Sequence, residues 1–134
     1  MTMDMKELLA LTQSKRVLLV EDDEDIRVSM ETLFEDLFQE ATVAADGQDG
    51  WEKFQAGSFD LVITDINMPK MDGIELLKNI RTIDAHIPVV MLTAHNDMKY
   101  VIGASQHRTS GYIIKPLTLD SLGEALIKIE EARS

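Results

Sequence analysis

Short continuous runs of hydrophobic residues recur along the chain, separated by segments in which the hydrophobic residues are spaced by three or four. Such a run is typical of a strand that is buried on both faces. The predicted strands cover residues 17–20, 42–45, 61–64, 89–92 and 112–114. The second is the weakest prediction, because a threonine and two alanines make up most of it.

The segments between these runs have helical periodicity. In the first of them the spacing is typical of an amphipathic helix, and its apolar residues are Ile26, Met30, Leu33, Phe34, Leu37 and Phe38. Further helices are predicted around Trp51 and Phe54, over 74–80, roughly over 97–107, and over 119–129. We expect the helix near 97–107 to be short, because Gly103 and the polar stretch 106–110 have low helix propensity.

Strands that alternate with helices predict a parallel sheet covered on both faces. Right-handed connections then give an α/β fold, a doubly wound five-stranded parallel sheet flanked by five helices. We assign residues 16–132 to this one domain. Residues 1–15 form an N-terminal extension in which Met5, Leu8, Leu9 and Thr12 would share one face of a short helix. A frayed end and a dimer or linker helix both remain open for it.

Composition narrows the class of protein. The 134 residues suit one soluble domain, and no apolar run approaches the ~18 residues needed to cross a bilayer. We also expect no secretory signal, since no basic region followed by an apolar core opens the chain. The lack of cysteine excludes disulfides and thiolate metal sites, and it suits a cytoplasmic location. A net charge of −11 argues against direct binding to nucleic acid or an anionic membrane.

Chemically reactive side chains follow the predicted strands where each strand ends. Glu21 and Asp22 follow the first strand, Asp65 the third, Thr93 the fourth and Lys115 the fifth. The carboxyl ends of parallel strands meet at one edge of the sheet, which is where such folds bind ligands. The sequence therefore predicts a site in which three carboxylates, a hydroxyl and an amine lie close together.

The carboxylates favour a metal site. Negative charges this close repel one another unless a cation or a proton offsets them. Oxygen ligands without histidine or cysteine favour Mg²⁺, or alternatively Mn²⁺, over zinc. An alternative is that Glu21, Asp22 and Asp23 only cap the helix that follows. Capping does not explain Asp65, which ends an apolar strand.

Asp65 has the chemistry of a nucleophile as well as a ligand. An aspartate carboxylate can attack phosphorus to form an acyl phosphate. The charge on the transferring oxygens then needs cationic and hydrogen-bonding partners, which Lys115 and Thr93 would supply.

Four segments carry a resemblance to the response-regulator receiver domain of two-component signalling. They have that family's order and roughly its spacing, and they cover residues 20–23, 64–73, 93–94 and 111–116. The resemblance spans residues 16–132 and implies a flavodoxin-like fold, in agreement with the pattern of strands and helices.

The resemblance also implies a role for each site residue. Asp65 would accept the phosphoryl group. Asp22 would bind the metal directly, Glu21 largely through water, and Asn67 through its backbone carbonyl. An alternative register would use Asp22 and Asp23 as the acidic pair.

A switch is implied by the same resemblance. Thr93 would move toward the phosphoryl group and Tyr112 would turn into the space it leaves. The surface formed by the fourth helix, fifth strand and fifth helix would then change its affinity for a partner. The implied partners are a sensor histidine kinase and a downstream protein or fused output domain, with the chain a monomer or a phosphorylation-linked dimer.

Three other functions compete with this prediction. A phosphatase with a nucleophilic aspartate normally has a second carboxylate two residues later, where this chain has Asn67. We therefore expect a signalling domain that catalyses only its own phosphorylation and dephosphorylation. A flavodoxin-like binding domain would need a phosphate loop where this chain is acidic. A pseudo-receiver that only binds proteins would not need Asp22, Asp65, Thr93 and Lys115 together.

Overall fold

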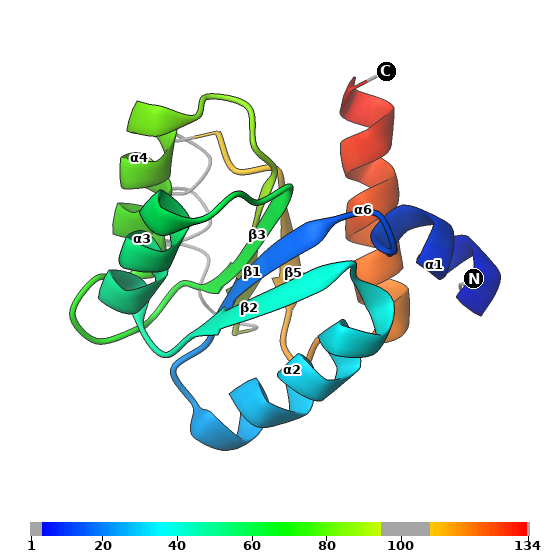
Figure 1. The fold of residues 1–134 in the computed structure, drawn as a ribbon, viewed down its shortest axis with the longest axis horizontal. Helices are drawn as coiled ribbons and strands as arrows, with labels where there is room; N and C mark the ends of the chain where they lie inside the picture. Colours follow the sequence, from blue (N-terminus) through cyan, green and yellow to red (C-terminus); the bar gives the residue numbers. More distant parts are fainter. Residues whose placement is uncertain (1–3, 95–107, 134) are drawn as a thin grey trace.

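The computed structural model describes residues 4–94 and 108–133, and these contain one five-stranded parallel sheet. Its strands lie in the order β2-β1-β3-β4-β5 (Figure 1). They are β1 (Arg16–Val20), β2 (Glu40–Ala44), β3 (Leu61–Asp65), β4 (Val89–Thr93) and β5 (Gly111–Ile114). Each strand overlaps the run of residues predicted for it.

The strands end almost in step, which determines where the site lies. Val20 is paired with Ala44 on one side and with Thr64 on the other. Asp65 is paired with Leu92, and Thr93 with Ile114. The residues that end or directly follow β1, β3, β4 and β5 therefore share one edge of the sheet.

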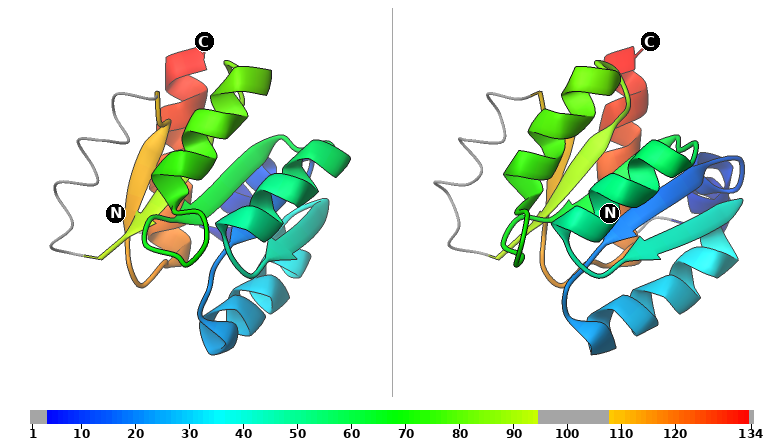
Figure 2. Two further views of the ribbon diagram at one scale, coloured as in Figure 1. Left: turned by 90° about the vertical axis from the view of Figure 1, so that its left-hand side faces the viewer. Right: turned by 60° about the vertical axis from the view of Figure 1, so that its left-hand side comes forward.

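Helices cover both faces of the sheet (Figures 1 and 2). Helices α2 (Glu24–Leu37) and α6 (Leu119–Arg133) lie on one face, and α3 (Gly47–Ala56) and α4 (Gly73–Ile83) on the other. Three of these helices begin at aspartates whose carboxylates accept a backbone hydrogen bond from the first turn: Asp23, Asp46 and Asp72. Each face has its own buried cluster, which is why β1, β3 and β4 are mainly apolar up to their carboxyl ends.

The N-terminal extension contains helix α1 (Met5–Thr12), which begins at Asp4. Leu8 is buried in the same apolar cluster as Phe34 of α2 and Leu126 of α6. Lys15, which follows the helix, is ion-paired with Glu130 (3.0 Å). Helix α1 therefore packs against the sheet and α6 as part of the folded core.

The predicted fold class is confirmed: a doubly wound, five-stranded parallel sheet flanked by helices. The helix predicted near 97–107 lies outside the described residues. Ile26, predicted on the apolar face of its helix, is 41% exposed. Within residues 4–94 and 108–133, no helix has the length and apolarity needed to cross a membrane.

Candidate functional site

Glu21 directly follows β1 and is completely buried. Its backbone amide donates to the carbonyl of Ala44 (3.1 Å), which continues the pairing of β1 with β2. Its carboxylate accepts a hydrogen bond from the amide of Asp23 (3.0 Å), and its carbonyl accepts one from Arg27 (3.0 Å). Glu21 is thus held at the sheet edge by residues at the start of α2.

Asp65 is the last residue of β3 and is only 1% exposed. Its Oδ1 is ion-paired with Nζ of Lys115. The same ammonium group lies 3.4 Å from Oε1 of Glu21. Lys115 is held in place because its amide donates to the carbonyl of Thr93 (2.9 Å) and because Pro116 follows it. One lysine therefore serves two buried carboxylates.

Asp22 adds a third carboxylate from the solvent side. Glu21, Asp22 and Asp65 each offer one oxygen, and these oxygens lie within 4.8 Å of one another. Asp23, by contrast, turns back to accept a hydrogen bond from the amide of Ile26 (3.0 Å) and starts α2. The helix-capping interpretation of this acidic run therefore applies to Asp23.

The donor set fits a hard divalent cation. Both carboxylate oxygens of Asp65 are buried, and neither receives a hydrogen bond from any amide or hydroxyl of the described residues. Lys115 brings one positive charge to a group of three acidic side chains. One lysine leaves part of this buried negative charge uncompensated, which is unfavourable unless a further cation or a proton offsets it. The closely spaced oxygens provide ligands of the kind that Mg²⁺ binds.

Burial and neighbouring charges shift the pKa values of Asp65, Glu21 and Lys115. Burial, together with the neighbouring Glu21, raises the pKa of Asp65 to about 8, although Lys115 opposes the rise. Burial alone would raise the pKa of Glu21, but contacts with Asp65, the Asp23 amide and Lys115 bring it below its usual value. The pKa of Lys115 is raised, because the two carboxylates outweigh its burial. Without a metal, Asp65 therefore holds a proton up to a higher pH than an exposed aspartate does.

Thr93 ends β4 and is 4% exposed. The pairing of Leu92 with Asp65 puts Thr93 one residue beyond Asp65 at the sheet edge. Its hydroxyl donates to the carbonyl of Ala94 (3.1 Å), so its present partner belongs to the adjacent loop.

The two remaining predicted residues lie around this centre. Asn67 is exposed in the loop that leaves β3. Tyr112 is half-buried on β5, opposite Met91, and packs against the cluster under α3 and α4.

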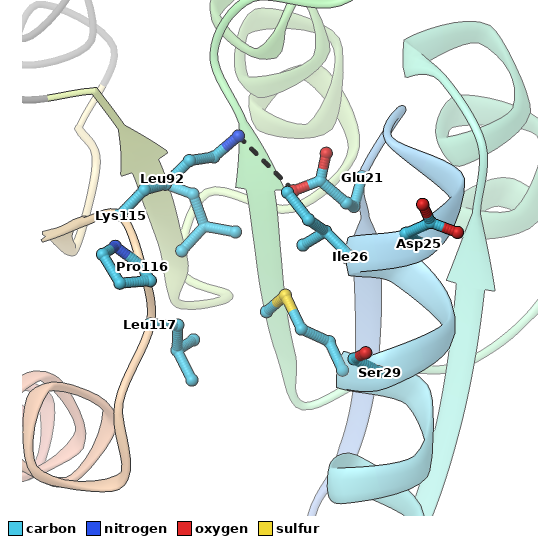
Figure 3. A pocket seen from close by; sticks show the side chains of 9 residues that line it. Glu21, Asp25, Ile26, Ser29, Leu92, Lys115, Pro116 and Leu117 are labelled. Atoms are coloured by element: carbon cyan, nitrogen blue, oxygen red, sulfur yellow. Dashed lines mark ion pairs between the residues drawn. The ribbon is translucent and has the colours of Figure 1, made fainter.

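A hollow beside the carboxylates was not predicted from the sequence. It has a volume of about 510 Å³ and lies between α2 and the connection from β5 to α6 (Figure 3). Lys115 reaches across one end of it toward Glu21, and the remaining lining is mainly apolar. The apolar lining residues are Ile26, Met30, Leu92, Pro116 and Leu117. The exposed position of Ile26 is explained by this hollow, which no local periodicity indicates.

Comparison with known proteins agrees with this geometry. The family model described as the response regulator receiver domain matches residues 17–127. Chemotaxis protein CheY-3 of Vibrio cholerae is 41% identical over 124 residues, covering 90% of this chain and 95% of that protein. Chemotaxis protein CheY of Pseudomonas aeruginosa is 37% identical over 119 residues, covering 87% and 96%.

Solved structures show the same similarity. The crystal structure of a response regulator receiver domain protein from Clostridium thermocellum has a TM-score of 0.78 at 31% identity and covers 88% of this chain and 96% of that one. The chemotaxis response regulator CheY4 of Vibrio cholerae has a TM-score of 0.77 at 30% identity, covering 88% and 99%. The chain therefore belongs to the response regulator receiver domain family.

Proposed function

We propose that Asp65 accepts a phosphoryl group from a sensor histidine kinase in a reaction that depends on Mg²⁺. The observation that carries this proposal is the burial of Asp65 beside Lys115, with two further carboxylates near enough to share a cation. A buried carboxylate serving only stability would usually accept hydrogen bonds from several donors, whereas Asp65 has the Lys115 ammonium but no amide or hydroxyl donor among the described residues.

The reaction forms one bond and breaks another. A carboxylate oxygen of Asp65 bonds to phosphorus while the bond from phosphorus to the donor's histidine nitrogen breaks. The leaving nitrogen retains the electron pair and takes up a proton. Lys115 would move from the carboxylate toward a transferred phosphoryl oxygen, and Thr93 would donate its hydroxyl to another.

Glu21, Asp22, Asp65 and the backbone carbonyl of Asn67 would hold the metal, with Glu21 acting largely through water. When bound, Mg²⁺, or Mn²⁺ in its place, supplies positive charge that offsets the charge of the carboxylates and of the incoming phosphoryl oxygens. The protein's part is to keep Asp65 buried and correctly oriented, and to provide Lys115.

The consequence of phosphorylation would be a shift between two conformations. Thr93 would exchange its present hydrogen bond to Ala94 for one to the phosphoryl group. Tyr112, which is half-buried on the neighbouring strand, would then turn inward and alter a protein-binding surface. The partner would be a downstream protein or a fused output domain in the cytoplasm, without direct contact to nucleic acid or membrane. The protein would act as a monomer or as a phosphorylation-linked dimer.

Intact-mass measurement tests this proposal directly. Incubation with a small phosphodonor and Mg²⁺ should add one phosphoryl group to the wild-type protein. Asp65→Asn should remove the adduct, since an amide is a poor nucleophile. Asp36→Asn, an exposed position on the outer side of α2, is the matched control and should be modified as the wild type is. An adduct that persists in Asp65→Asn would reject the assignment.

A further inference from the structure

The loop that carries Asn67 runs from β3 to α4 and is fixed at both ends. The amide of Gly73, just after the loop, donates to the carbonyl of Ile66 at its start (2.7 Å). Gly73 also lies so close to the backbone of Asp65 that an added Cβ would overlap the Asp65 carbonyl oxygen. The two ends of the loop are therefore held together directly behind the predicted phosphoacceptor.

The middle of the loop has an unusual backbone conformation. Lys70 has a φ of 68°, in the left-handed region that non-glycine residues rarely occupy. The next amide, that of Met71, donates to the carbonyl of Pro69 (2.8 Å). A lysine remains in this conformation only when its surroundings fix the chain on either side.

The first residues of α3 provide that restraint. The Gly47 backbone is so close to the carbonyl oxygen of Met71 that a Cβ at position 47 would overlap it. Beside this contact, Nζ of Lys70 lies 3.6 Å from Oδ2 of Asp46, which is also the residue that caps α3. The turn of residues 46–47 is remote in sequence from the loop but touches it at two consecutive residues.

We infer that the Asp46–Gly47 turn positions the loop of residues 66–72, so that it sets how well the Asn67 carbonyl and Asp65 together bind Mg²⁺. The inference rests on the proposed function, because it assigns the turn a purpose in that site. Gly47 and Lys70 are positioning residues that touch neither metal nor phosphate. The backbone contact at Gly47 is the larger effect, since the ion pair is exposed at Lys70 and such pairs contribute little.

Titration calorimetry with MgCl₂ on the full chain tests the inference. In Gly47→Ala the turn and the loop must move apart, and we expect Mg²⁺ affinity to fall by about tenfold or more, as for other residues that orient metal ligands. Gly57→Ala, at the far end of the same helix, is the glycine control, because a Cβ there meets the Phe59 ring at 3.1 Å and the Lys53 carbonyl oxygen at 3.4 Å, with no overlap as severe as at Gly47. Phe54→Leu, in the core beneath α3, controls for lost stability. Both controls should bind Mg²⁺ as the wild type does.

Charge and positioning make opposite predictions for Lys70. Removing a cation near a metal site should strengthen Mg²⁺ binding if charge alone matters. If the turn positions the loop, Lys70→Gly should weaken binding, by about twofold, even though glycine accepts the left-handed φ without strain. Asp46→Asn keeps a capping oxygen and removes the ion pair with Lys70. In the double variant, Mg²⁺ affinity should therefore be no lower than in Lys70→Gly alone.

The outcomes separate this inference from the proposed function. Wild-type affinity in a folded Gly47→Ala protein overturns the inference and leaves phosphorylation at Asp65 intact. If Gly47→Ala does not fold, the other variants decide. The inference is overturned if Lys70→Gly binds Mg²⁺ more tightly than the wild type, or if the effects of Lys70→Gly and Asp46→Asn on Mg²⁺ affinity are additive. If the wild-type protein itself fails to bind Mg²⁺, the proposed function and the inference fall together. Hydrogen exchange at the Gly73 amide provides a readout without metal, and it should quicken in Gly47→Ala but not in the Gly57→Ala control.

Discussion

Asp65 combines two properties that oppose one another in a protein interior: it is an acid, and it is almost fully buried. Burial disfavours the charged form, and the nearby Glu21 disfavours it further, so that the pKa of Asp65 rises to about 8. Lys115 limits the rise. The free energy of unfolding should therefore depend on pH through this residue.

In EDTA, the wild-type protein should lose stability relative to Asp65→Asn as the pH rises from 5 to 9. The pKa of Asp65 is higher in the folded than in the unfolded chain, so the folded protein binds more protons over this range. The stabilising contribution is complete below the unfolded-state pKa and is lost as the pH passes the folded value of about 8. Urea unfolding of both proteins at several pH values measures the difference. A difference that does not change with pH would show that Asp65 ionises normally in the metal-free protein.

At the scale of elements, helix α1 adds an apolar side chain to the core from outside the β-α repeat. Leu8 is 1% exposed and packs with residues of α2 and α6, while Met5 on the same helix is 49% exposed. Thr12 is also buried, and its hydroxyl donates a hydrogen bond to the carbonyl of Leu8 (3.2 Å). The helix covers apolar surface that would otherwise face water.

Leu8→Ala should lower the free energy of unfolding by about 2–5 kcal/mol, the usual range when a leucine is removed from a packed core. Met5→Ala is the matched control and should change it by less than about 0.5 kcal/mol, because its side chain is largely in water. Chemical denaturation measures both. Equal effects of the two substitutions would mean that α1 does not pack as described.

At the scale of the whole molecule, a net charge of −11 and a cluster of carboxylates at one sheet edge lead us to expect that a divalent cation stabilises the fold. A ligand that binds only the folded chain stabilises it by mass action. The metal would also bring Asp65 into its ionised form.

Adding Mg²⁺ at about 100 times its Kd should raise the free energy of unfolding by about 2.7 kcal/mol. Asp22→Asn should lose most of this gain while folding normally without metal, because Asp22 is exposed. KCl at matched ionic strength controls for general screening of the acidic surface. Thermal melts report the shift, and an equal gain in the wild type and Asp22→Asn would place the ion elsewhere.

Much of the molecule was predictable from the sequence, because its signals are local. The run of apolar residues before Asp65 and the helical spacing after Gly73 each indicate an element without knowledge of the rest. Parallel strands then bring their carboxyl ends to one edge, and this rule alone predicted that Glu21, Asp65, and Lys115 would lie together. The structure confirmed the predicted fold class, and the comparisons confirmed the predicted family.

The sequence by itself determined the order of strands and helices and the chemistry at the strand ends, because periodicity and residue type are properties of neighbouring positions. Only the tertiary structure decided that one ammonium group serves both Asp65 and Glu21, that Leu8 belongs to the core, and that Gly47 touches Met71. These contacts join segments far apart in the chain. Their distances follow from strand register and helix packing, which no local pattern of residues encodes.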